Sequence, residues 1–199
     1  MLKNPIKDIK LGREKPRPRF LAEQKQGRLI EACGRAQNAF YLKDMVVLDL
    51  HTGLREEELL QLKREDVLVD GKKLKVEDGK GGKRRYVPLN DTARAVLEIL
   101  LARGGSDYLF HDKNGKLFKD IKKSFIPAVE RAGLKDVVFK DLRRTFATMC
   151  ALRRVPPKTL QNWMGHESIT TTMKYYVISP EDHEQEQIKR LDGMSGGVL

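Results

Sequence analysis

The sequence predicts an α+β fold that is mainly α-helical and contains a small three-stranded antiparallel sheet. Apolar residues recur at the three- and four-residue spacing of a helix over most of the 199 residues. Three short runs rich in valine and leucine interrupt this pattern, and Asp70-Gly71 and residues 79–82, which separate them, have the composition of hairpin turns. Prolines and glycines mark where several of the helices begin or end.

Two helices are expected before the sheet, at residues 21–36 and 40–51. Gly53 follows the second helix directly, at a position that suits a left-handed helix end. Arg55 is therefore expected just past a helix terminus, at the start of a short helix that also holds Glu58.

The three strands are expected at residues 67–69, 74–76 and 85–89. Asn90 or Asp91 then provides a side-chain cap for a helix that runs to about Leu101.

Most of the second half of the chain is predicted to be helical. The expected helices cover residues 117–132, 140–152, 156–165, 170–176 and 180–191. Pro127 lacks a backbone donor and is expected to disturb the first of these helices, whereas Pro156 and Pro157 suit a helix start.

A chain of this length fits one domain with its own core. Residues 1–19 mix basic residues with three prolines and predict a basic linker whose upstream domain is absent; residues 20–191 form the expected domain, and residues 192–199 a flexible tail. Cys33 and Cys150 lie among apolar neighbours, which is typical of reduced thiols in a cytoplasmic protein. No run approaches the ~18 apolar residues of a membrane span, and no export signal is evident.

The chain is strongly basic. It has 39 lysines and arginines against 28 acidic residues, a formal net charge of +11. Such an excess points to a polyanionic partner such as nucleic acid, although a basic protein without such a partner has the same composition.

Five short strings suggest a chemistry when they are taken together. They are Gly53-Leu54-Arg55, Gly79-Lys80-Gly81, Lys140-Asp141-Leu142-Arg143, Met164-Gly165-His166 and Lys174-Tyr175-Tyr176. Cleavage of a phosphodiester by a side-chain oxygen needs a nucleophile, cations on the non-bridging oxygens, and a proton donor for the leaving oxygen. These strings supply candidates for each role.

In this order and spacing, over residues 20–175, the strings resemble the catalytic domain of the tyrosine recombinases, the phage integrase family. The resemblance implies the DNA breaking-rejoining fold and site-specific recombination through a 3′-phosphotyrosine intermediate. By this resemblance Tyr175 is the nucleophile, Arg55 and Arg143 clamp the phosphate, and Lys80 protonates the leaving 5′ oxygen. His166 would donate a hydrogen bond to the phosphate, and Glu58 would hold the cations of the site.

One position departs from the family. The usual His-x-x-Arg is here Lys140-x-x-Arg143, and a lysine that stays charged can donate a proton but cannot accept one. Lys140 remains a candidate catalytic residue, with an altered pH dependence as the expected consequence. Further DNA contacts are expected from Lys83, Arg84 and Arg144.

The histidines and cysteines have no metal-ligand spacing, and the glycine-rich turn lacks the pattern of a nucleotide-binding loop, so neither a metal nor another cofactor is expected. The implied partners are double-stranded DNA and other recombinase protomers, as a tetramer on paired sites and as a monomer or weak oligomer without DNA. A type IB topoisomerase-like enzyme and a non-catalytic DNA-binding module of the same fold remain alternatives.

Overall fold

The computed structural model describes residues 20–36, 39–68, 72–77, 84–118 and 120–176. The helices are α1 (Glu23–Gly34), α2 (Leu42–Thr52), α3 (Glu56–Leu60), α4 (Asp91–Arg103), α5 (Lys122–Arg131), α6 (Lys140–Leu152), α7 (Pro157–Met164) and α8 (Ile169–Met173). The expected linker, C-terminal helix and tail lie outside the described residues, as do Lys80 and Lys83.

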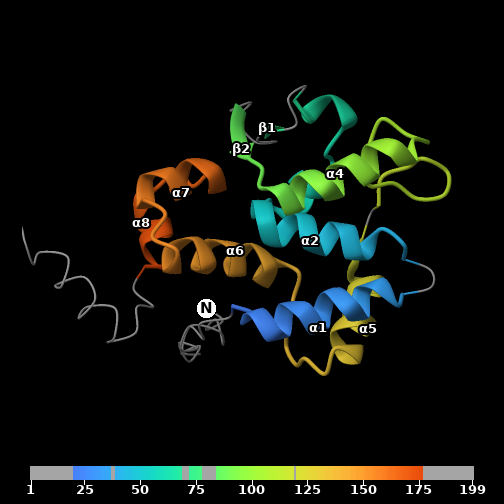
Figure 1. The fold of residues 1–199 in the computed structure, drawn as a ribbon, viewed down its shortest axis with the longest axis horizontal. Helices are drawn as coiled ribbons and strands as arrows, with labels where there is room; N and C mark the ends of the chain where they lie inside the picture. The colour runs from blue at the N-terminus through green and yellow to red at the C-terminus, as the bar shows by residue number, and fades with distance from the viewer. Residues whose placement is uncertain (1–19, 37–38, 69–71, 78–83, 119, 177–199) are drawn as a thin grey trace, which may run out of the picture.

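Helix α2 forms the centre of the fold. It packs against α1, α4 and α6, and Figure 1 shows it between α4 on one side and α1 with α5 on the other. Nine of its eleven residues are buried, so it is apolar on almost every side, as expected for a helix inside a core. The large core around α2 therefore holds the C-terminal end of this helix, and the turn that follows it, in place.

The described residues contain a two-stranded antiparallel sheet, in which β1 (Lys73–Glu77) pairs with β2 (Arg84–Pro88). A third strand was expected at residues 67–69. This prediction is wrong at Val67, which forms an isolated bridge to Leu74 and is not part of a strand. The chain before it is curled into a 3₁₀ turn, η1 (Arg64–Asp66), because the carboxylate of Asp66 accepts a hydrogen bond from the backbone N–H of Lys63 at 3.0 Å. A capped turn of this kind competes with an extended strand.

The predicted helix at residues 117–132 begins later than expected. Leu117 pairs with His111 in an isolated bridge, and the carboxylate of Asp112 accepts from the backbone N–H groups of Asn114 and Lys116 in a turn. The helix α5 starts at Lys122, whose N–H bonds the side chain of Asp120 at 2.8 Å, and it contains Pro127.

Other boundaries agree with the sequence. Helix α6 spans the predicted residues, Asn90 caps α4 by accepting from the N–H of Ala93 at 3.0 Å, and α7 begins at Pro157. Helices α7 and α8 lie together at one end of the molecule, beside the C-terminal part of α6 (Figure 1). No helix among the described residues is long and apolar enough to cross a membrane.

Candidate active site

The turn between α2 and α3 presents the first arginine of the site. Gly53 ends α2 with φ +60°, and its N–H donates to the carbonyl of Asp49 at 2.8 Å. A Cβ atom at this position would lie 2.3 Å from the ring of Phe146, so the turn requires glycine for both conformation and space. Arg55 follows in an extended conformation, immediately before the first residue of α3.

Glu58 joins two arginines from distant parts of the chain. Arg55 Nη1 donates to Glu58 Oε1 at 2.6 Å, and the two Nη atoms of Arg85, from β2, donate to both carboxylate oxygens at 2.8 and 2.6 Å. Burial alone would raise the pKa of this carboxyl group, but the hydrogen bonds and charge of Arg85, with the bonds from Arg55, lower it to about 2. Glu58 is therefore ionised near neutral pH and orients both guanidinium groups.

Arg143 is the fourth residue of α6 and is 8% exposed. It donates through Nη1 to the carbonyl of Gly53 and through Nη2 to the carbonyl of Met164, both at 2.5 Å. Burial, followed by the nearby charge of Arg55, lowers its pKa to about 10, so it remains charged near neutral pH. Arg143 thus ties the end of α2 to the end of α7.

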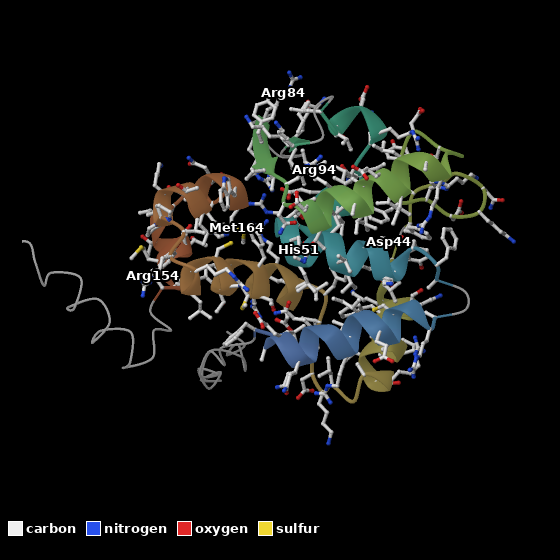
Figure 2. All side chains as sticks on the ribbon, in the orientation of Figure 1. Asp44, His51, Arg84, Arg94, Arg154 and Met164 are labelled. Atoms are coloured by element: carbon white, nitrogen blue, oxygen red, sulfur yellow. The ribbon has the colours of Figure 1, made fainter. Side chains whose placement is uncertain are left out.

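The C-terminus of α7 provides acceptors for the other two arginines. Arg55 Nη2 donates to the carbonyl of Gly165 at 2.9 Å, and Arg85 Nε donates to the carbonyl of Trp163 at 2.9 Å. Gly165 has φ +63°, and a Cβ atom there would lie 3.0 Å from Arg85 Cδ. Met164 is fully buried, and in Figure 2 it lies between α7 and α6. The last carbonyls of α7 therefore hold three guanidinium groups together, as expected at the negative end of a helix dipole.

His166 lies directly after this helix end. Its Nδ1 is 2.9 Å from the hydroxyl of the buried Thr172, and its ring stacks on that of Tyr175 with centroids 6.2 Å apart and an interplanar angle of 11°. Burial and the positive charges of Arg143, Arg55 and Arg85 lower the pKa of His166 to about 4. The imidazole is consequently neutral near pH 7.

The adjacent tyrosines have different surroundings. The hydroxyl of Tyr176 donates to the backbone carbonyl of Val155, and burial, with the nearby Cys150, raises its pKa. Tyr175 is half-buried against His166, and its hydroxyl has no hydrogen-bond partner among the described residues. Of the two phenols, Tyr175 is the one that is open to a reaction partner beside the arginines.

The remaining predicted residues are more peripheral. Lys140 is the exposed first residue of α6, three positions before Arg143. Arg144 forms an ion pair with Asp141 at 2.8 Å, and Arg84 forms an exposed one with Glu77 at 2.8 Å. Within the described chain, no group of three or more histidine, cysteine or acidic residues has an arrangement that would hold a metal ion.

A family model described as the phage integrase family matches residues 19–182. The chain belongs to the phage integrase family. The tyrosine recombinase XerA of Pyrococcus furiosus is 31% identical over 192 residues, which are 90% of this chain and 65% of XerA. The chain thus spans less than two thirds of this relative. The tyrosine recombinase XerC of Staphylococcus carnosus is 31% identical over 173 residues, which are 81% of this chain and 58% of XerC.

Solved structures agree with this membership. The catalytic domain of bacteriophage HP1 integrase is 28% identical with a TM-score of 0.65, covering 90% of this chain and 98% of that domain. The XerH site-specific recombinase bound to its palindromic difH substrate in a post-cleavage complex is 25% identical with a TM-score of 0.69, covering 85% of this chain and 52% of XerH. The fold of this integrase-family chain is therefore that of a recombinase catalytic domain.

Two residues of this integrase-family site were not among the sequence predictions. Arg85 was assigned only to a strand, although it is 12% exposed and forms an ion pair with Glu58 at 2.6 Å. The available signal was that Arg85 lies two positions before Val87 in a short strand and therefore on the same face. Asp49 is 1% exposed on α2, one turn before Gly53. The signal for it was an acidic residue inside the apolar run from Met45 to Leu50.

Proposed function

We propose that this protein catalyses site-specific DNA recombination by cleaving and rejoining strands through a phosphotyrosine at Tyr175. The observation that carries the proposal is the convergence of Arg55, Arg85 and Arg143 on the end of α7, next to the stacked rings of His166 and Tyr175. Membership of the integrase family and likeness to recombinase catalytic domains support it.

In the proposed reaction, the phenolic oxygen of Tyr175 attacks the scissile phosphorus and the bond to the 5′ oxygen breaks. The negative charge that develops on the non-bridging oxygens is met by the guanidinium groups of Arg55 and Arg143. Guanidinium groups already oriented by Glu58 and by backbone carbonyls need little reorganisation when the phosphate arrives. We assign Arg85 to positioning, because within the described residues it bonds both carboxylate oxygens of Glu58, which in turn orients Arg55, and the carbonyl of Trp163.

Protons balance across this step. The phenol loses one proton as the bond to phosphorus forms, and the leaving 5′ oxygen gains one, for which Lys80 is the proposed donor. In the proposed tautomer, Nδ1 of the neutral His166 accepts from the Thr172 hydroxyl, which is 2.9 Å away, and Nε2 carries the hydrogen that is donated to the phosphate. Rejoining is the reverse attack by a 5′ hydroxyl, and the phosphotyrosine bond retains the energy needed for it.

The proposed partners are double-stranded DNA and further protomers on paired sites. The net charge of +11 suits a polyanion. Lys83, Arg84 and Arg144 are proposed phosphate contacts. Such contacts position DNA without reading its sequence.

A pool of randomised duplexes that each carry a nick near the cleavage position tests this function. Cleavage releases a short fragment that diffuses away, so the covalent adduct is trapped and migrates slowly on a denaturing gel. We expect adduct from the parent protein and none from Tyr175→Phe, with equal DNA binding by both. Binding without adduct from either protein would indicate a non-catalytic DNA-binding module.

A further inference from the structure

Asp49 is a buried acid without a charged partner. It is 1% exposed and forms no ion pair among the described residues, whereas Asp44 on the same helix pairs with Arg103 at 2.7 Å. Its Oδ1 atom is fully buried and has no hydrogen-bond partner in the described part of the chain. A carboxyl group in such a place is costly to ionise, because neither water nor a cation compensates the charge.

The groups that face Asp49 come from α6 and from α3 with the turn before it. Arg143 on α6 favours the ionised form, Glu58 and Glu56 on α3 oppose it, and the backbone N–H of Leu54 donates a hydrogen bond to the carboxyl group. Arg143 forms no ion pair with Asp49, and its two Nη atoms donate to the carbonyls of Gly53 and Met164. Burial dominates, and it raises the pKa of Asp49 well above its usual value.

We propose that Asp49 is a neutral carboxylic acid in the assembled site, with its proton on Oδ1, and that its neutrality leaves the charge of Arg143 available to the phosphate. The lack of any donor at Oδ1 favours the neutral form, because an ionised oxygen in that place would lie buried without a compensating hydrogen bond. An ionised Asp49 would instead add a second negative charge, after Glu58, on the side of Arg143 that faces the core. The catalytic part of this inference rests on the proposed function, and its protonation part does not.

Asp49 also belongs to the turn that presents the arginines. Its carbonyl accepts from the N–H of Gly53, and the carbonyl of Gly53 accepts from Arg143. A neutral side chain of the same shape, which still accepts from Leu54, should keep this geometry. Asp49 is thus a positioning residue, and asparagine is its matched neutral replacement.

Equilibrium unfolding by denaturant tests the protonation without any DNA. A folded-state pKa above the unfolded value means that folded Asp49 binds more protons, so the parent loses stability as pH rises above the unfolded value. Asp49→Asn has no titrating group at this position, so it does not lose stability in this way. The advantage of Asp49→Asn over the parent should grow from about pH 4 to about pH 8. An advantage that stays constant across this range would show that Asp49 ionises normally and would overturn the proposal.

Two controls keep this test decisive. Asp44→Asn removes a buried carboxylate from the same helix that is paired with Arg103, and it controls for the loss of a buried acid as such. If Asp49→Asn does not fold, the ¹³Cγ chemical shift of Asp49 in the parent gives the protonation state directly by NMR. A carboxylate shift for Asp49 at about pH 7 would contradict the proposal.

The nicked-duplex assay tests the catalytic part. The ratio of the adduct rates of Asp49→Asn and the parent should stay constant from about pH 6 to about pH 8, because neither side chain carries a charge in this range when Asp49 is neutral. A folded Asp49→Asn protein that is about a hundredfold slower would mean that the carboxylate is needed. If the parent itself forms no adduct, the proposed function fails, whereas the unfolding and NMR results still decide whether Asp49 is neutral.

Discussion

The arginine cluster and the segment that carries Tyr175 are anchored to very different amounts of core. Arg55, Arg85 and Arg143 extend from elements that surround the large core around α2 and the sheet. Tyr175 follows the five-residue helix α8 and rests on a small cluster in which Ala147, Leu160 and Met164 are the buried members. Figure 1 shows α7 and α8 at one end of the molecule, away from α1 and α5.

The hydrogen bonds of the two regions differ in the same way. Each arginine is held by a carboxylate or by helix-end carbonyls. Arg143, for example, bonds the carbonyls of Gly53 and Met164, both at 2.5 Å. The segment with Tyr175 is held by its backbone bond to Thr172 at 3.0 Å, by the ring of His166 and by the hydroxyl of Tyr176. The frame of Arg55, Arg85 and Arg143 is therefore formed without DNA, and Tyr175, the proposed nucleophile, lies in the part of the site that can adjust with the least loss of packing.

Arg143→Ala should have the largest effect, because it breaks the frame. It removes a cation from the phosphate and leaves the buried carbonyls of Gly53 and Met164 without their donor. We expect adduct formation to fall about a thousandfold and the free energy of unfolding to fall by about 2 to 4 kcal/mol. Cleavage rates and denaturant unfolding measure the two losses. Arg143→Lys, which keeps the charge, should lose less, and equal cleavage by parent and Arg143→Ala would remove Arg143 from the mechanism.

Acid should weaken the frame through Glu58, which is 7% exposed. Its folded-state pKa of about 2 lies below the ordinary 4.5, so its contribution is present above pH 4.5 and is lost as pH falls through about 2. The contribution is on the order of 3 kcal/mol. The difference in unfolding free energy between the parent and Glu58→Gln should shrink as the pH is lowered over this window. A difference that does not change with pH would mean that the two arginines do not lower the pKa of Glu58.

Gly53→Ala should distort the frame without removing any charge. The new Cβ atom would lie 2.3 Å from the ring of Phe146 in a backbone conformation that disfavours alanine. We expect a loss of about 2 kcal/mol in unfolding free energy. Gly27→Ala is the matched control, since its Cβ meets nothing within 4 Å on α1, and it should gain about 0.5 kcal/mol. Similar changes in both variants would show that the α2–α3 turn is not tightly constrained.

Lys140 should matter less, since it is exposed at the start of α6 and stands outside the arginine network. We expect Lys140→Ala to slow adduct formation about tenfold by removing one cation near the phosphate. Lys140→His restores the family's usual residue and should be tolerated, with a shifted pH profile. Rates that match the parent for Lys140→Ala from about pH 6 to about pH 9 would make Lys140 a bystander.

The sequence predicted the parts of the site that depend on local patterns. Gly53 and Gly165 end their helices in the left-handed conformation, and Lys140 and Leu152 bound α6 as expected. These features follow from the residues themselves, because glycine and helix periodicity act over a few positions. The order of the five strings was then enough to indicate the family.

Long-range contacts were not predictable in this way. Arg85 meets Glu58, 27 positions away, and Trp163, 78 positions away, and only the folded chain brings them together. The surroundings of Asp49 could not be predicted for the same reason, since they are set by α6 and by α3. The strand expected at residues 67–69 failed because the local cap by Asp66 turned the chain before it.

The most direct measurement is the identity of the tyrosine that becomes attached to DNA. After trapping on the nicked duplexes, protease digestion and mass spectrometry locate the phosphotyrosine bond. We predict attachment at Tyr175 in the parent, no adduct from Tyr175→Phe, and an adduct still at Tyr175 in Tyr176→Phe, formed a few-fold more slowly because the bond to Val155 is lost. Attachment at Tyr176, or an adduct formed by Tyr175→Phe, would contradict the account.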